Sequence, residues 1–345
     1  MIAAAPETVR NRIRLIASGA PPSFRGAAGV RPGRGVEVVF FNRSGRRGSS
    51  PHKKGKRQKQ AVGGREKFRE VGLKMAKYAI LSDIHANGDA LDVVLEKCRE
   101  LEITHYVSLG DIVGYNAEPR QCLYRVRDLN WVAMVRGNHD EYTAHGNPEQ
   151  SGFNPHAKAA ITWTREQLDE SEREWLVSMP FRTTIPGLNS TIVHATLDSP
   201  ENWGYIFDVH HAADNFAYQF TQICYCGHSH VPVAFHKKPI TAVNERSIEE
   251  IPAWVYNEKL GDNNFDFTQP DSLTVEVQVG FKYLFNVGSI GQPRNHDPRA
   301  SFAVLDTEER TITRYRLPYD IASQQNKIID AGLPERLALR LASGS

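Results

Sequence analysis

Several features of exported and membrane-bound proteins are missing from this chain. It contains no run of about 18 apolar residues, so we expect no membrane-spanning helix. Its N-terminus lacks the continuous apolar stretch that a secretory signal needs. The 345 residues include only 4 cysteines, whose spacing matches no disulfide framework, so we expect a reduced, cytoplasmic setting. Cys224 and Cys226 share one face of a predicted strand, which favours buried thiols over a disulfide.

Charge is distributed unevenly along the chain. Residues 1–74 carry 18 Lys and Arg against 4 Asp and Glu, whereas residues 75–345 carry 24 against 36. The basic segment is rich in Arg, Gly, Ser and Pro, so we expect it to be disordered. Three explanations of it are open: translation that starts at Met75, a basic arm that binds nucleic acid or acidic partners, or an organellar transit peptide. Residues 75–345 suffice for one α/β domain with a sizeable core.

Five short motifs with metal-binding side chains occur in the acidic part. Their oxygen and imidazole donors, without thiolate, suit manganese, iron, zinc, cobalt or nickel, and suit magnesium less well. These donors are numerous enough to hold two divalent ions. Two ions about 3.5–4 Å apart activate water for attack on phosphate esters. Asp111 is the natural bridge, because one carboxylate can give an oxygen to each ion. The motifs are Asp83-Ile84-His85, Gly110-Asp111, Gly137-Asn138-His139-Asp140, His194 and Gly227-His228-Ser229-His230.

The first three motifs each follow a short apolar run typical of a buried strand. These runs are residues 77–82, 104–109 and 131–135. Apolar residues at helical spacing predict a helix over 90–101, and Pro119 favours another over 119–129. This alternation predicts a layered α/β fold in which the motifs meet at the carboxyl ends of the strands.

The rest of the chain reads as a helix, a group of strands and a terminal helix. Strand-like runs lead directly into His194 and into the pair His228 and His230. Residues 236–280 are the least regular, and we expect a surface insertion or a cap over the site there. The predicted helices are 157–176 and 333–341, and the predicted strands are 183–185, 191–193, 222–226, 281–287, 301–306 and 311–317.

The ordered motifs resemble those of the calcineurin-like metallophosphoesterase superfamily over residues 77–317. The resemblance implies a layered β-sandwich of two mixed sheets flanked by helices. It also implies two metal ions, with a metal-bridging hydroxide that attacks phosphorus in line and without a covalent enzyme intermediate. Carried over to this sequence, the first metal is held by Asp83, His85, Asp111 and His230, and the second by Asp111, Asn138, His194 and His228.

Three further residues receive roles from the same motif. The family residue that matches His139 protonates the leaving oxygen or stabilises its charge, a general-acid role. We expect Asp140 to orient that imidazole and Arg136 to hold a phosphate oxygen by a bidentate contact.

A narrower likeness, to small prokaryotic phosphoesterases described as diadenosine tetraphosphatase-like, covers residues 110–115, 154–168 and 286–294. Gly114-Tyr115 stands where the protein phosphatases and the symmetrical diadenosine tetraphosphate hydrolases have an arginine, which weakens both of those specific assignments.

The leading hypothesis is metal-dependent hydrolysis of phosphomono- or diesters. The substrate is then a phosphorylated small molecule, a nucleotide or a phosphoprotein. One alternative is a non-catalytic scaffold that binds metal, against which the presence of His139 and Asp140 argues. The other is a nucleic-acid binder that uses residues 1–74. Residues 196–220 and 236–280, where substrate determinants are expected, carry no readable motif.

Overall fold

The computed structural model describes residues 76–147, 152–239, 247–255 and 266–345. The expectations for residues 1–74, including a start at Met75, lie outside the described residues. Within the described ranges, no helix is long and apolar enough to cross a membrane.

The first of two sheets has the strand order β3-β2-β1-β11-β12-β9. Its first three strands in the sequence run parallel, and the other three join them in antiparallel pairs. The parallel strands therefore end at one common edge. The strands are β1 (Lys77–Leu81), β2 (His105–Ser108), β3 (Trp131–Met134), β9 (Asp271–Glu276), β11 (Ala300–Asp306) and β12 (Thr311–Leu317).

The second sheet has the order β4-β5-β6-β10-β7-β8. Here too the central strands β5, β6 and β10 run parallel. The strands are β4 (Arg182–Thr184), β5 (Ser190–Val193), β6 (Ile223–Cys226), β7 (Val233–Lys237), β8 (Ile248–Glu250) and β10 (Lys282–Asn286).

The sheets pack face to face and form the predicted sandwich. Tyr78 and Ile80 of β1 face the interior between the sheets, where they join Tyr225 and Phe285 of the second sheet. The alternate β1 residues belong to a separate core beneath the helices. Because β1 is buried on both faces, it reads in the sequence as an unbroken apolar run.

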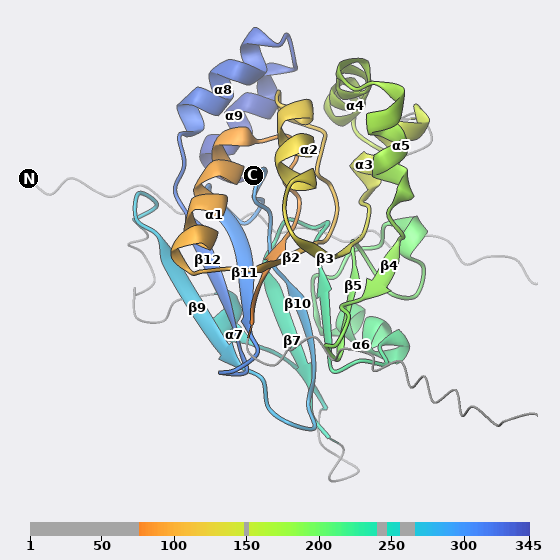
Figure 1. Cartoon of the computed structure of the whole chain (residues 1–345), viewed down its shortest axis with the longest axis vertical. Coiled ribbons are helices and arrows are strands. Elements are labelled where there is room, and N and C mark those ends of the chain that lie inside the picture. Colours follow the sequence, from red (N-terminus) through yellow and green to blue (C-terminus); the bar gives the residue numbers. More distant parts are fainter. Residues whose placement is uncertain (1–75, 148–151, 240–246, 256–265) are drawn as a thin grey trace, which may run out of the picture. The chain divides into compact units, whose positions relative to one another are not determined.

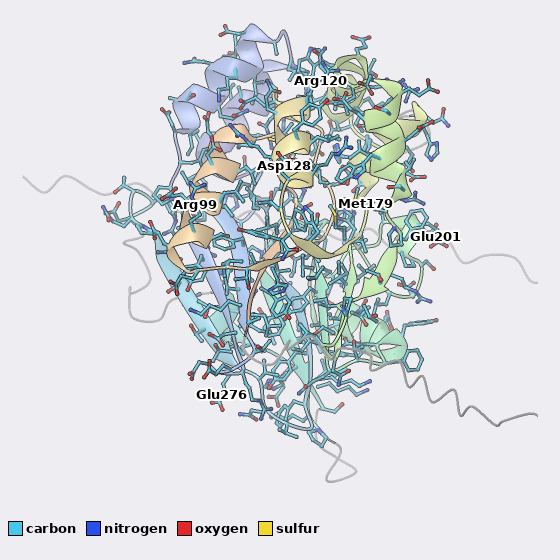
Figure 2. All side chains as sticks on the ribbon, viewed as in Figure 1. Arg99, Arg120, Asp128, Met179, Glu201 and Glu276 are labelled. Atoms are coloured by element: carbon cyan, nitrogen blue, oxygen red, sulfur yellow. The ribbon has the colours of Figure 1, made fainter. Side chains whose placement is uncertain are left out.

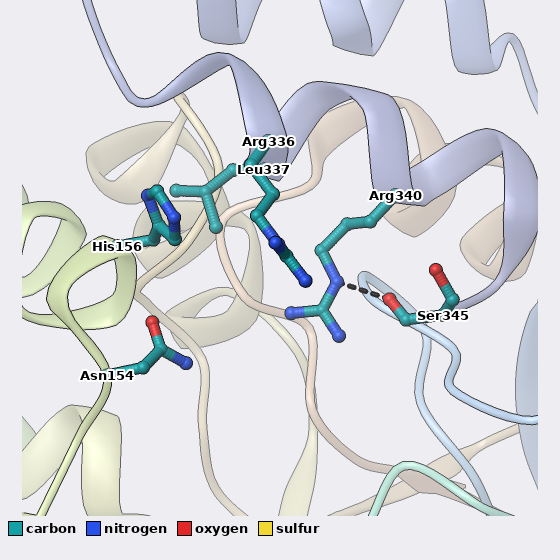
Figure 3. Close-up of a pocket in the computed structure, with 6 residues that line it drawn as sticks. All are labelled: Asn154, His156, Arg336, Leu337, Arg340 and Ser345. Carbon is teal, nitrogen blue, oxygen red and sulfur yellow. Dashed lines mark hydrogen bonds between the residues drawn. The ribbon is translucent and has the colours of Figure 1, made fainter.

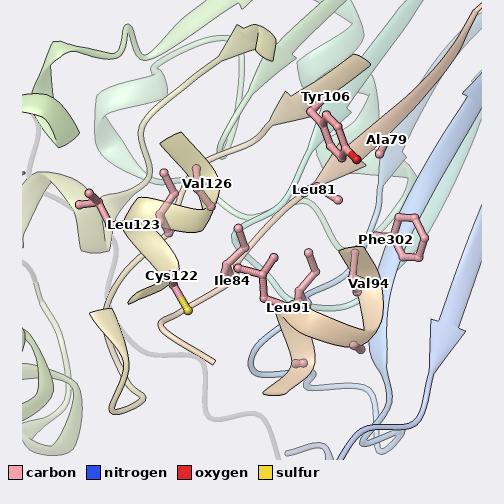
Figure 4. Close-up of a cluster of buried hydrophobic side chains, with 14 of the residues drawn as sticks. Ala79, Leu81, Ile84, Leu91, Val94, Tyr106, Cys122, Leu123, Val126 and Phe302 are labelled. Atoms are coloured by element: carbon pink, nitrogen blue, oxygen red, sulfur yellow. The ribbon is translucent and has the colours of Figure 1, made fainter. Parts of the chain in front are cut away.

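Helices cover the outer faces of both sheets (Figure 1). Leu91 of α1 and Leu123 of α2 pack with Leu81 and Phe302 of the first sheet (Figure 4), and each such buried side chain contributes roughly 1.5–3 kcal/mol. Charged side chains such as Arg99 lie on the outside (Figure 2). The helices are α1 (Gly88–Glu100), α2 (Pro119–Arg127), α3 (Asn138–His145), α4 (Pro155–Gln167), α5 (Glu170–Ser178), a short 3-10 helix (Pro200–Asn202), α6 (Val209–Tyr218), α7 (Pro252–Val255), α8 (Ile321–Asp330) and α9 (Glu335–Ser343).

One expectation about the elements is wrong. The single helix expected over 157–176 is two helices, because Asp169 accepts a hydrogen bond from the Glu172 N–H at 2.9 Å and starts α5 afresh. The described parts of 236–280 are the end of β7, β8, α7 and β9, and the expectation of an insertion or a cap for the rest lies outside the described residues. Lys237 pairs with Lys282 at the amino end of β10, so β7 ends away from the carboxyl ends where the motifs meet.

Candidate metal centre

The predicted ligands come together because parallel strands in each sheet end at the same edge. At that edge, the loops after β1, β2 and β3 meet the loops after β5 and β6. Backbone hydrogen bonds join loops within each sheet: Asp83 N–H donates to Gly110 O at 3.1 Å, and Gly227 N–H donates to His194 O at 2.9 Å. The His228 N–H donates to the Asp83 carboxylate at 3.2 Å, which ties one sheet's loop to the other's.

We call Asp83, His85, Asp111 and His230 the first cluster. Their ligand atoms all lie within 4.8 Å of one another, and all four residues are buried. His85 Nε2 lies 3.1 Å from His230 Nε2 and 3.5 Å from Asp111 Oδ2. His230 Nε2 lies 3.2 Å from Asp83 Oδ1.

The imidazole tautomers of this cluster are set by backbone carbonyl groups. His85 Nδ1 lies 3.1 Å from Val113 O, and His230 Nδ1 lies 2.6 Å from Gln292 O. A carbonyl oxygen can only accept, so each Nδ1 carries the hydrogen and each Nε2 presents a lone pair. Two such lone pairs 3.1 Å apart, beside two carboxylates, need a cation between them. The donor set therefore fits a divalent metal ion.

We call Asp111, Asn138, His194 and His228 the second cluster. Asn138 Oδ1 lies 3.1 Å from His194 Nε2 and 3.0 Å from His228 Nδ1. The Nδ1 atom of His194 is held by Leu109 O at 2.8 Å, as in the first cluster. The Nε2 atom of His228, by contrast, is buried and has no hydrogen-bond partner among the described residues.

Asp111 belongs to both clusters through one oxygen atom. Its Oδ2 lies 3.5 Å from His85 Nε2 and 3.3 Å from His194 Nε2, and no donor within the described ranges hydrogen-bonds to it. Its Oδ1 accepts from the backbone N–H of His139 at 2.8 Å. Asp111 Oδ2 is thus the oxygen of this carboxylate that faces imidazoles of both clusters.

Most ligand groups carry the charge that ligation needs at neutral pH. The exception is His194: burial lowers its pKa, but the Asp111 carboxylate outweighs burial and raises it to about 9, so a cation has to displace its proton. Burial lowers the pKa of His228 and of His230 to about 3, helped by the nearby charges of His194 and Arg294 respectively, so both imidazoles are neutral. Burial raises the pKa of Asp83 and Asp111, but the surrounding imidazoles outweigh it and hold both below the usual range. The carboxylates are therefore charged and able to bind a cation.

The backbone at the site is strained. Five of the seven expected ligands have φ between 48° and 66°, a region that non-glycine residues seldom adopt and that is concentrated at functional sites. Gly137 is needed for a different reason: a Cβ there would lie 2.0 Å from Asp111 Oδ1. The strained ligands are Asp83, His85, Asp111, His228 and His230.

Asp140 does not orient His139, contrary to our expectation. Its Oδ2 accepts from the N–H groups of Asp111 at 2.8 Å and Gly137 at 3.1 Å. Its Oδ1 accepts from Ile112 at 2.9 Å and Val113 at 3.3 Å. Asp140 therefore fixes the turn that carries Asp111 against the start of α3. Burial and the Asp111 charge raise its pKa to about 7, although these N–H donors oppose the shift.

Arg136 is also placed differently from our expectation. Its guanidinium group lies 3.9 Å from the ring centre of Phe181 and pairs with Glu141 at 3.1 Å, and it donates to Val177 O. It does not line the cavity at the metal centre, so its role is to anchor α3 and the segment after α5.

A cavity of about 330 Å³ opens at the two clusters. His139 lies in its wall, as expected, with its ring centre 4.7 Å from that of His85. Two arginines from the C-terminal part of the chain also line it, Arg294 and Arg340. Arg294 ends the segment 286–294 that carries the narrower likeness to small prokaryotic phosphoesterases, whereas no motif marks Arg340. The cavity is lined by Asp111, Tyr115, Asn138, His139, Gly152, Phe153, Asn154, Tyr205, His228, His230, Arg294 and Arg340.

Comparison with known proteins places this site in a family. The family model for the calcineurin-like phosphoesterase superfamily domain matches residues 76–251. An uncharacterized protein of Methanocaldococcus jannaschii is 33% identical over 268 residues, which cover 77% of this chain and 97% of that protein. A metallophosphoesterase from Sphaerobacter thermophilus has a TM-score of 0.63 and 34% identity, with 79% of this chain and 100% of that chain covered. A hypothetical protein from Pyrococcus horikoshii shares the fold, with a TM-score of 0.60, 21% identity, and 79% and 99% of the two chains covered. With its buried Asp and His cluster, the chain is a metal-dependent phosphoesterase and belongs to the calcineurin-like phosphoesterase superfamily.

Proposed function

We propose that the chain hydrolyses phosphomono- or diesters at a pair of divalent ions, one held by each cluster. The observation that carries this proposal is the position of Asp111 Oδ2, which faces an imidazole of each cluster and accepts no hydrogen bond from the described residues. Two ions held there supply Lewis acidity and a hydroxide nucleophile at neutral pH.

The chain's own residues position the substrate and stabilise its leaving group. The imidazole of His139 faces the cavity beside the first cluster, and its Nδ1 has no hydrogen-bond partner in the described part of the chain. Burial holds the pKa of this imidazole well below its usual range, so it is neutral, and we assign it a hydrogen bond to the leaving oxygen that stabilises the developing charge. Arg294 donates to Tyr115 Oη at 3.1 Å and to Gln292 Oε1 at 3.2 Å, which leaves its positive charge at the cavity wall for a phosphoryl oxygen.

Metal loading and hydrolysis together test this proposal. Protein freed of metal with a chelator is reloaded separately with manganese, iron, zinc, cobalt or nickel, and the bound metal is counted. Each form is then assayed with p-nitrophenyl phosphate and with bis(p-nitrophenyl) phosphate. We expect two ions per chain and turnover of at least one ester. A protein that binds two ions and hydrolyses neither ester is a metal-binding scaffold.

His139→Ala separates catalysis from metal binding. The side chain belongs to neither cluster, and the backbone N–H that Asp111 accepts from is kept in alanine. We therefore expect two bound ions and a fall in turnover of about 10²–10⁴-fold. The matched control is His145→Ala, because His145 lies on the same helix, is half exposed and pairs with Glu141. Equal turnover in the two variants removes His139 from the mechanism.

A further inference from the structure

A second cavity adjoins the one at the metal centre. It has a volume of about 460 Å³ and is formed largely by α9 and by the start of α4 (Figure 3). Arg340 and Asn154 line both cavities, so the two share a wall. A molecule bound at the metal centre can therefore extend into the second cavity, which is lined by Asn154, His156, Arg336, Leu337, Arg340 and Ser345.

Three guanidinium groups gather where the cavities meet. Arg336 and Arg340 are one turn apart on α9, and their guanidinium groups lie close together in Figure 3. Like charges at this spacing destabilise a helix. Burial, together with the charges of Arg294 and Arg336, lowers the pKa of Arg340 to about 10. The three positive charges therefore repel one another, which favours binding of a further anion here.

No acidic side chain of the described residues forms an ion pair with any of the three. Arg294 donates to the neutral side chains of Tyr115 and Gln292, and Arg340 Nε donates to the main-chain carboxylate of Ser345, the last residue. That carboxylate offsets one of the three positive charges. Other arginines of the chain pair with carboxylate side chains, as Arg120 does with Glu172 at 2.8 Å. Three guanidinium groups with one carboxylate among them leave net positive charge at this cavity.

We propose that the second cavity binds a second anionic group of the substrate, a phosphate or a carboxylate, while the phosphate to be cleaved occupies the metal centre. Arg340 lies at the shared wall between the two anions, and Arg336 binds the distal one. Asn154 caps α4 by accepting from the Ala157 N–H at 3.0 Å, so the positive end of that helix faces the same space. The substrate class is a phosphate ester with two separated anionic groups. This inference rests on the proposed function.

Alkane diphosphonates of increasing chain length test the inference by binding rather than by turnover. Isothermal titration of the metal-loaded protein compares each diphosphonate with methylphosphonate, which carries only one anion. Bound metal is counted afterwards to exclude its removal by the ligand. We expect one spacer length to bind at least about tenfold more tightly than methylphosphonate, which corresponds to one added charge-assisted hydrogen bond.

Substitutions in the cavity test whether its arginines cause that gain in affinity. Arg336 lies on the exposed side of α9. We expect Arg336→Gln to abolish the gain in affinity while methylphosphonate still binds. Arg336→Lys keeps the charge and restores part of the gain. Arg99→Gln, an exposed arginine of α1, is the control and keeps the full gain. A gain that survives in both Arg336→Gln and Arg340→Gln overturns the inference.

The two proposals fail in different ways. If p-nitrophenyl phosphate is hydrolysed but no diphosphonate binds more tightly than methylphosphonate, the second subsite is refuted and the proposed function stands. If neither nitrophenyl ester is hydrolysed but the gain depends on Arg336, the subsite stands and the proposed function falls.

Discussion

The two ligand clusters differ in charge and in how firmly their side chains are held. The first has two carboxylates, and both of its imidazoles are fixed through Nδ1 by backbone carbonyl groups. The second shares one of those carboxylates, adds the neutral amide of Asn138, and has one imidazole, His228, without such an anchor. His228 instead stacks on the ring of Tyr205 at 4.3 Å, and Tyr205 is half exposed.

This difference indicates that the two clusters bind a divalent ion with different affinities. Affinity for a divalent ion rises with the number of charged ligands and with the rigidity of the site. The first cluster is therefore suited to hold its ion permanently. Both clusters reach the cavity, the second through Asn138 and His228 and the first through His230. The second cluster, with fewer charged ligands, is suited to an ion that is held more weakly.

Asp111→Asn should have the largest effect, because it removes the charge that the clusters share. We expect neither ion to be retained after dialysis. Because bound metal supplies several kcal/mol of transition-state stabilisation, turnover should fall by about 10³-fold or more. Metal analysis and the p-nitrophenyl phosphate assay measure both effects. Two retained ions in this variant would show that Asp111 is not the bridge.

His194→Ala and His85→Ala sharpen the comparison, since each removes one imidazole from one cluster. His194→Ala leaves the first cluster complete, so we expect one tightly bound ion per chain. His85→Ala should weaken the tighter of the two ions. Turnover should fall by at least about 100-fold in both, since even an outer partner of a ligand contributes about 10–100-fold. Identical metal contents in the two variants would mean that the clusters do not bind independently.

Gly137→Ala tests how closely Asp111 is positioned. The φ of Gly137 is −99°, which alanine tolerates, so the effect is steric: the new Cβ would lie 2.0 Å from Asp111 Oδ1. A displaced bridge should lower turnover by up to about 100-fold and weaken both ions. Gly332→Ala is the control for destabilisation away from the site: its φ of +70° strains alanine, but no atom lies within 4 Å of the new Cβ. Full activity in Gly137→Ala would mean that the site adjusts to the added methyl group.

The sequence allowed the ligands to be predicted because their signals are local. Asp83, Asp111 and Asn138 each follow a strand that reads as a short apolar run, and parallel strands must end together. The direction in which a side chain points depends on its packing in the folded protein, which the motif does not reveal. Arg136 has the right place in the motif, but Glu141 and Phe181 draw its guanidinium group away from the cavity. Arg340 was missed because it reaches the site only through the packing of α9, about 200 residues after the motif of Asn138.

The smallest effect concerns the order in which the intact protein binds its ions. Titration of the metal-free protein with manganese should show two steps, with the first tighter by about tenfold or more, because that cluster has the extra carboxylate and both anchors. Calorimetry gives both affinities, and the paramagnetic coupling of neighbouring manganese ions appears only in the second step. The single step of His194→Ala should match the first step of the intact protein. Two equal affinities would mean that the carbonyl anchors and the second carboxylate do not distinguish the clusters, and that the exposed ring behind His228 fixes it as firmly as a hydrogen bond.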